Sequence, residues 1–212
     1  MIITVDGPAA SGKGTLARRL AAHFRLPHLD TGLLYRGVAF LVLQGNHALE
    51  DEDAAAGIAR KLDLKKMDHD ALRSRGLGEA ASRVAAIPEV RAALLKMQQD
   101  FANASSGAVL DGRDTGTVIA PHADVKIFVT ATPEERARRR HIELAARHSP
   151  VAYDEVLADI KKRDERDSER SIAPLKPASD AVLLDTTQLD IEAAFRAALS
   201  IVEASRAGRA RS

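Results

Sequence analysis

A glycine-rich segment near the amino terminus has the residue types and spacing of a phosphate-binding loop. It matches the pattern G-x-x-x-x-G-K and consists of Gly7, Pro8, Ala9, Ala10, Ser11, Gly12, Lys13, Gly14 and Thr15. The segment lies between an apolar stretch and a helix-forming stretch, as this motif requires. Glycines let backbone N–H groups approach phosphate oxygens, and a helix N-terminus attracts anions. Lys13 can reach the outer phosphates and neutralise developing charge, so the segment predicts an ATP site with Lys13 as a catalytic residue.

One position departs from the commonest form of this motif. Gly14 stands where other phosphate loops have a serine or threonine that binds Mg²⁺, and the hydroxyl group comes one residue later, at Thr15. Mg²⁺ usually keeps several waters and is often bound through substrate phosphates. We therefore expect Mg²⁺ as a cofactor held mainly by phosphates and water, and we predict no metal site made of protein ligands.

Two arginine-rich segments lie in the second half of the chain. Residues 134–140 could form a solvated helix with two ion pairs, Glu134–Arg138 and Glu135–Arg139. Further along, Arg163, Arg166 and Arg170 recur at a spacing that places them on one face of a helix. A face with several guanidinium groups suits a polyanionic ligand, because the planar fork of arginine matches phosphate oxygens.

The elements that must position these residues alternate between strand and helix. Apolar, β-branched runs predict strands at Met1–Val5, Ala108–Leu110, Val125–Val129 and Val182–Leu184. Helical spacing predicts helices at Lys13–Phe24, Leu33–Leu43, Asp51–Leu62, Glu79–Ala86, Glu89–Phe101, from Pro133 onward, at Asp154–Arg170 and at Asp190–Ala204. Lys65–Gly78 is expected to be a loop or a poorly ordered insert, and Arg206–Ser212 a frayed tail. This alternation predicts an α/β fold of three layers, a parallel β-sheet flanked by helices.

Composition excludes several classes of protein. The 212 residues fit one domain, and 31 basic against 30 acidic residues leave a net charge of +1. A general nucleic-acid binder usually shows a basic excess, and aromatic content of 3% argues against a stacking platform for single strands. The chain has no cysteine, no apolar run of membrane-spanning length, and no metal spacing among its 7 histidines. We therefore expect a cytoplasmic protein without nucleic-acid or membrane partners.

Four further motifs, together with the G-K-G-T ending of the loop, resemble the bacterial cytidylate (CMP/dCMP) kinases, a branch of the nucleoside monophosphate (NMP) kinases. The motifs follow one another in the family's order at Leu29–Arg36, Ala80–Arg91, Asp111–Thr117 and Lys162–Leu175. Together they extend over residues 3–184. The resemblance implies a three-layer P-loop kinase fold and the transfer of phosphate from ATP to CMP and dCMP, giving CDP and dCDP.

The resemblance also implies roles for individual residues. Arg36, Arg113 and Arg170 correspond to arginines that bind the acceptor phosphate. Thr31, Arg163 and Asp167 correspond to contacts with the sugar and its surroundings, and Ser82, Arg91 and Asp114 to the group that recognises cytosine. The chemistry agrees, because the exocyclic amine of cytosine is a donor and needs an acceptor such as Asp114. Uracil has a carbonyl oxygen in that position, which a carboxylate would repel.

By the same resemblance, one kinase domain at 1–212 contains an NMP-binding region at about 31–107 and a helical lid at about 133–170. Lid arginines, Arg139 among them, would cover the transferring phosphate. The implied catalytic residues are then Lys13, Arg113, Arg139 and Arg170. The family usually carries a small β-sheet in the NMP-binding region, whereas residues near 63–78 are too short and polar for one, so we expect a shortened insert.

Two alternatives stay open at this point. One is a P-loop kinase for another small acceptor, such as UMP, shikimate, gluconate or dephospho-coenzyme A. The other is a regulator that binds ATP without transferring phosphate. In the preferred hypothesis the partners are small-molecule nucleotides, ATP and CMP or dCMP, and the protein is a monomer.

Overall fold

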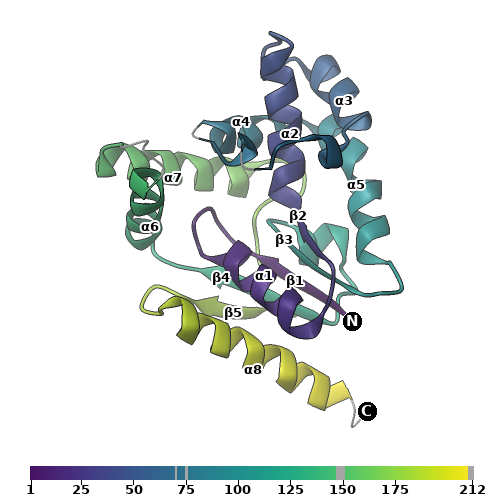
Figure 1. Cartoon of the computed structure of the whole chain (residues 1–212), viewed down its shortest axis with the longest axis vertical. Coiled ribbons are helices and arrows are strands. Elements are labelled where there is room, and N and C mark those ends of the chain that lie inside the picture. The colour runs from purple at the N-terminus through teal and green to yellow at the C-terminus, as the bar shows by residue number, and fades with distance from the viewer. Residues whose placement is uncertain (70, 75, 147–150, 210–212) are drawn as a thin grey trace.

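A five-stranded parallel β-sheet forms the centre of the protein in the computed structural model, which describes residues 1–69, 71–74, 76–146 and 151–209 (Figure 1). The strands lie in the order β2-β3-β1-β4-β5. Their bounds are β1 (Ile2–Asp6), β2 (His28–Asp30), β3 (Ala108–Gly112), β4 (Val125–Thr130) and β5 (Val182–Asp185). Because all strands are parallel, their carboxyl ends meet at one edge of the sheet. This edge therefore brings together loops that are far apart in the sequence.

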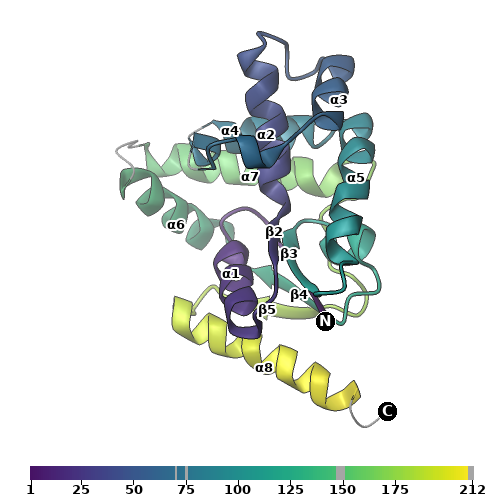
Figure 2. The ribbon, with the colours of Figure 1, turned by 45° about the vertical axis from the view of Figure 1, so that its right-hand side comes forward.

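The residues of β1 alternate between the two faces of the sheet. Ile3 and Val5 pack into an apolar cluster with α1 (Lys13–Phe24) and α8 (Ile191–Arg209). Asp6 points to the opposite face, where it accepts hydrogen bonds from a turn of π-helix, η3 (Thr115–Ile119). On that face α5 (Pro88–Ala102) also contributes to a smaller apolar cluster. The sheet is thus covered on both faces, and the predicted α/β fold with a flanked parallel sheet is confirmed (Figure 2).

A second apolar core lies among the helices that follow β2. It is built by α2 (Thr31–Gln44), α3 (Glu52–Arg60), α4 (Leu77–Val84) and the first half of α5. Two short 3₁₀ helices, Leu64–Lys66 and Ala71–Arg73, connect α3 to α4. Leu72 is almost completely buried there. This helical part stands above the carboxyl edge of the sheet (Figure 1).

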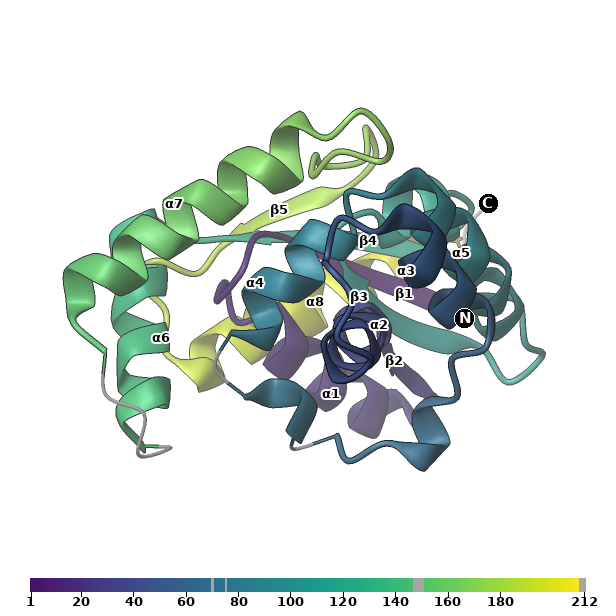
Figure 3. The same cartoon turned by 90° about the horizontal axis from the view of Figure 1, so that it is seen from above.

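A third apolar core joins α6 (Pro133–Ala146) to α7 (Tyr153–Glu169). Ala137, Val156 and Ile160 are among its buried members, and Ala10 of the phosphate loop packs against it. Seen from above, α7 runs beside α4, and the loop between β1 and α1 lies between α4 and α6 (Figure 3). The phosphate loop therefore packs against the α6–α7 part through Ala10 and has α4 on its other side in this view.

Some predicted elements differ from the structure. The strand β2 was not predicted. The predicted loop at Lys65–Gly78 overlaps the end of the first 3₁₀ helix and contains the second one and the start of α4. The tail is helical to Arg209, so the expected fraying is wrong for 206–209, while 210–212 lie outside the described residues. Within the described part of the chain, no helix is long and apolar enough to cross a membrane.

Candidate active site

The phosphate loop joins β1 to α1 in a conformation that demands small residues. Gly7 has a φ of +151°, and a Cβ atom there would lie 2.0 Å from the carbonyl oxygen of Val129. Ala10 and Gly12 also have positive φ angles, of 58° and 88°. The Ser11 hydroxyl is buried and finds no hydrogen-bond partner among the described residues. A buried donor without a partner is costly, so this loop is built for a polar ligand.

Lys13 is the first residue of α1, and its ammonium group donates to the carbonyl oxygen of Pro8 at 3.1 Å. Burial and the nearby positive charge of Arg113 lower its pKa to about 7, although Asp111 acts in the opposite direction. Burial and the charge of Arg113 both disfavour the charged form of this lysine in the free site. A bound polyphosphate would favour the charged form and raise the pKa again.

A buried ion pair lies at the end of β3. Arg91 from α5 donates to Asp114, and their side chains are 8% and 5% exposed. Arg170 approaches the other oxygen of Asp114 at 3.6 Å. The ring of Tyr35 lies 5.5 Å from the Arg91 guanidinium. Two predicted base-recognition residues, Arg91 and Asp114, are thus in direct contact.

Asp167 of α7 is the centre of a second buried cluster. It accepts hydrogen bonds from Ser82 at 2.9 Å and from Arg113 at 2.9 Å, and Arg163 lies 3.7 Å away. Burial would raise the pKa of Asp167, but the charges of Arg113 and Arg163 prevail and hold it at about 2. Ser82, one of the predicted base-recognition residues, contacts the predicted sugar-binding residue Asp167. These bonds join α4 to α7 across the site.

The remaining predicted residues lie around these clusters. Thr31 begins α2 and donates to the carbonyl oxygen of Asp111 at 2.8 Å. Arg36, also on α2, is close enough to Arg163 for its charge to help lower the pKa of Arg163, although burial and Arg113 do more. Buried nitrogens without a hydrogen-bond partner in the described chain include Arg163 Nε and Arg170 Nη2. The structure therefore gathers all the predicted acceptor-side residues between α2, α4, α5, α7 and the end of β3.

The arginines of α6 separate into different roles. Arg136 is buried, pairs with Asp164 at 2.6 Å and donates to the carbonyl oxygen of Ala9 in the phosphate loop. Arg139 donates to Thr186 and lies 3.9 Å from a Cβ built on Gly12. Both residues therefore contact or approach the phosphate loop and its surroundings.

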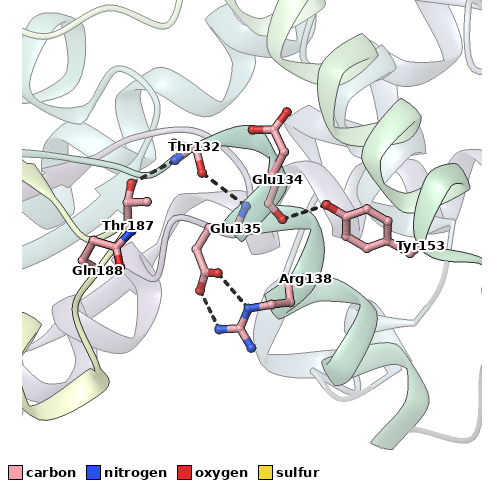
Figure 4. Close-up of a pocket in the computed structure, with 7 residues that line it drawn as sticks. All are labelled: Thr132, Glu134, Glu135, Arg138, Tyr153, Thr187 and Gln188. Atoms are coloured by element: carbon pink, nitrogen blue, oxygen red, sulfur yellow. Dashed lines mark hydrogen bonds and ion pairs between the residues drawn. The ribbon is translucent and has the colours of Figure 1, made fainter.

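Glu135 connects two of these arginines and lines a hollow of about 370 Å³ at the start of α6 (Figure 4). Hydrogen bonds from Arg138 and Arg139 lower the pKa of Glu135 to about 2. The predicted pair Glu135–Arg139 is confirmed at 2.8 Å. The predicted pair Glu134–Arg138 is wrong, because Arg138 turns to Glu135, which offers it both carboxylate oxygens.

Sequence reasoning missed several residues of this site. Thr186, just after β5, accepts from Arg139 and lies 3.1 Å from the carbonyl oxygen of Ser11. Glu79 accepts from Arg166 at 2.7 Å and adds a contact between α4 and α7. His28 lies 2.7 Å from Asp111. A polar residue directly after an apolar strand is a signal that could have drawn attention to Thr186.

A parallel sheet with a glycine-rich phosphate loop after its middle strand, and arginines such as Arg136 and Arg139 beside that loop, defines a P-loop kinase. The comparisons with known proteins narrow this class. A profile of the cytidylate kinase family matches residues 3–204. The chain belongs to the cytidylate kinase family.

Individual relatives agree over their full lengths. A protein of Methylocella silvestris named cytidylate kinase is 65% identical over 205 residues, 97% of this chain and 95% of the relative. Another, from Xanthobacter autotrophicus, is 65% identical over 99% of this chain and all of the relative. The crystal structure of an uncharacterized protein from Eubacterium ventriosum shares the fold, with a TM-score of 0.58, 15% identity and coverage of 96% of this chain and 99% of its own.

Proposed function

We propose that this protein transfers the γ-phosphate of ATP to CMP and dCMP, forming CDP and dCDP. Membership of the cytidylate kinase family supports this reaction. The observation that carries it is the cluster of Lys13, Arg113 and Arg163. Burial lowers the pKa of Lys13 to about 7 and that of Arg163 to about 10, and the charge of Arg113 adds to both shifts. Such like-charged, buried groups favour a site that two phosphorylated molecules enter together.

The donor side consists of the phosphate loop and the start of α1. Its glycines and the helix N-terminus suit the β- and γ-phosphates, Lys13 neutralises their charge, and the Ser11 hydroxyl is a spare donor. Arg139 is proposed to act from the lid, since it already lies beside Gly12. These groups stabilise the charge that spreads over the transferred phosphoryl group in the transition state.

The acceptor side consists of the clusters around Asp114 and Asp167. We assign Arg36, Arg113 and Arg170 to the acceptor phosphate, Thr31, Arg163 and Asp167 to the sugar, and Ser82, Arg91 and Asp114 to cytosine. The acceptor is an anionic phosphate oxygen, so no strong general base is required. The chain's main tasks are to orient two nucleotides in line and to exclude water.

Magnesium is proposed as the metal cofactor, and the residues present fit it. Asp111 has a buried carboxylate whose Oδ2 would lie 3.4 Å from a Cβ built on Gly14, so an oxygen faces the phosphate loop. The described residues contain no group of three or more acidic or histidine side chains placed to hold a metal by themselves. Asp111 would therefore hold the ion together with phosphates and water, and the ion would neutralise phosphate charge.

The helical parts suggest how the site would close. Residues 31–107 form the proposed NMP-binding region, with a shortened insert near 63–78, and 133–170 form the proposed lid. Hydrogen bonds from Ser82 and Arg166 already link the two regions. The monomeric state and the cytoplasmic location stay predictions, and light scattering in solution tests the first.

A coupled assay for ADP release tests the reaction. ATP and Mg²⁺ are held constant while CMP, dCMP, UMP, shikimate, gluconate and dephospho-coenzyme A are offered in turn. We expect the highest kcat/KM with CMP and dCMP. Turnover of a non-nucleotide without turnover of CMP would contradict the proposal. Tight ATP binding without turnover of any acceptor would favour the regulator.

A further inference from the structure

A histidine on the edge strand of the sheet contacts a carboxylate beside the phosphate loop. His28 begins β2, and its Nε2 atom lies 2.7 Å from Oδ1 of Asp111 in β3. The side chains are 19% and 5% exposed, so the contact is largely shielded from water. Hydrogen bonds to a charged group in such surroundings are among the stronger ones.

The two oxygens of Asp111 have different surroundings. Oδ1 is held by His28, whereas Oδ2 faces the phosphate loop, 3.4 Å from a Cβ built on Gly14. Asp111 also acts on Lys13, because its negative charge counteracts the lowering of the lysine pKa. The carboxylate thus lies between a histidine on one side and the phosphate-binding groups on the other.

The contact is not needed to keep the two strands together. The backbone of β2 already pairs with β3 at three registered positions, and the N–H group of Val109 donates to the carbonyl oxygen of Pro27 at 2.8 Å. We therefore assign the contact a different effect: it fixes the direction in which the Asp111 side chain points. Without it, the carboxylate could rotate, and Oδ2 would no longer face the phosphates and their magnesium ion.

We propose that His28 is a positioning residue that orients Asp111, so that Oδ2 faces the phosphates of the bound nucleotide and their magnesium ion. This inference rests on the proposed function, since it concerns the donor side of the same site. His28 itself touches neither nucleotide. Partners of this kind, which hold a carboxylate near a metal, typically change metal affinity or activity by about 10–100-fold when they are removed.

Three variants separate orientation from a general structural effect. His28→Leu removes the donor at similar size, and His28→Gln keeps a donor that can reach Asp111. His122→Leu is a matched control, because His122 lies 2.8 Å from an Asn103 oxygen on the exposed surface, outside the site. Calorimetry measures the affinity for ADP in the presence of Mg²⁺ and, separately, in the presence of a chelator. Circular dichroism on heating checks that each variant is folded.

We expect Mg²⁺ to strengthen ADP binding in the wild type, and this gain to fall by about 10-fold or more in His28→Leu. Affinity without Mg²⁺ should fall less than 3-fold. His28→Gln should recover most of the gain, and His122→Leu should equal the wild type. If His28→Leu does not fold, His28→Asn takes its place, because the shorter amide of asparagine cannot reach Asp111. His28→Asn should then lose the Mg²⁺-dependent gain in ADP affinity that His28→Gln keeps.

Two results would overturn the inference. One is an unchanged effect of Mg²⁺ in His28→Leu, or in His28→Asn if that variant replaces it. The other is an equal loss of affinity with and without the metal, which indicates a structural role alone. The proposed function is tested separately by acceptor turnover in the wild type. Absence of CMP turnover together with the expected His28 result would reject the reaction and keep the positioning role.

Discussion

The charge on Lys13 should make nucleotide binding depend on pH. In the free protein, burial and Arg113 lower the pKa of this lysine to about 7, so about half of the molecules carry a neutral lysine at pH 7. Phosphate oxygens next to the ammonium group favour its charged form and raise the pKa again. Binding therefore takes up a proton at any pH between the free and the bound pKa.

The size of the pH effect on affinity follows from the difference between the pKa values of Lys13 in the free and the bound protein. Below pH 7 the lysine is charged in both states, and its contribution to affinity does not change with pH. Above pH 7 each unit lowers the affinity by up to tenfold, about 1.4 kcal/mol, until the pKa of the bound state is reached. The terminal phosphate of the ligand has a pKa of about 6 and is fully ionised above pH 7.5. The window from pH 7.5 to 8.5 thus isolates the lysine.

Calorimetry with ADP in two buffers of different ionisation enthalpy measures both the dissociation constant and the number of protons taken up. We expect a loss of affinity approaching tenfold between pH 7.5 and 8.5, with uptake rising toward one proton. Lys13→Gln should bind more weakly and show neither effect. An affinity that is flat across this window in the wild type, without proton uptake, would refute the argument that Lys13 is partly neutral in the free site.

Three further substitutions and one control substitution test other parts of the site. Asp114→Ala leaves the buried charge of Arg91 unpaired, so urea unfolding should show a loss of about 3 kcal/mol, and the preference for CMP over UMP should disappear while ATP still binds. Arg136→Met leaves the carboxylate of Asp164 without its ion-pair partner and should also lower the free energy of unfolding by about 3 kcal/mol. Arg138→Met, at a side chain that is 59% exposed, should lower it by less than about 1 kcal/mol. Thr186→Val removes the hydroxyl that accepts from Arg139 and should raise the KM for ATP severalfold, through the loss of about 1 kcal/mol, with little change in the KM for CMP.

The central sheet and most helices could be predicted from the sequence because their signals are local. Runs such as Val125–Val129 fill buried strands, and Lys13–Phe24 shows helical spacing with matching ends. The strand β2 lacked such a signal. It has three residues, all half-buried, and it is a strand because β3 offers it a pairing edge. Because pairing with β3, which is distant in the sequence, stabilises β2, the local sequence pattern does not predict it.

The same reasoning explains which parts of the site were missed. The phosphate loop is a continuous motif, so its residues could be named from spacing alone. Arg136 belongs to a charged run that fits both a solvated helix face and a lid over the phosphate, and the run alone does not show which of its arginines is buried. Arg136 is buried because Asp164 and the carbonyl oxygen of Ala9 lie beside it. The π-helical turn at Thr115–Ile119 depends on Asp6, which accepts from the backbone of Thr115 and Gly116. Such partners come together only in the folded chain.

The distribution of apolar and charged contacts indicates how ligands would act on the fold. The sheet, the α2–α5 helices and the α6–α7 pair each have their own apolar core. The contacts between them at the site include charged pairs, such as Glu79–Arg166 and Arg113–Asp167. Charged contacts can rearrange without exposing an apolar core, while like charges at Lys13, Arg113 and Arg163 oppose a tight approach. Two phosphorylated ligands would remove that opposition, so we expect binding itself to favour the closure proposed for the two helical parts, in which water is excluded.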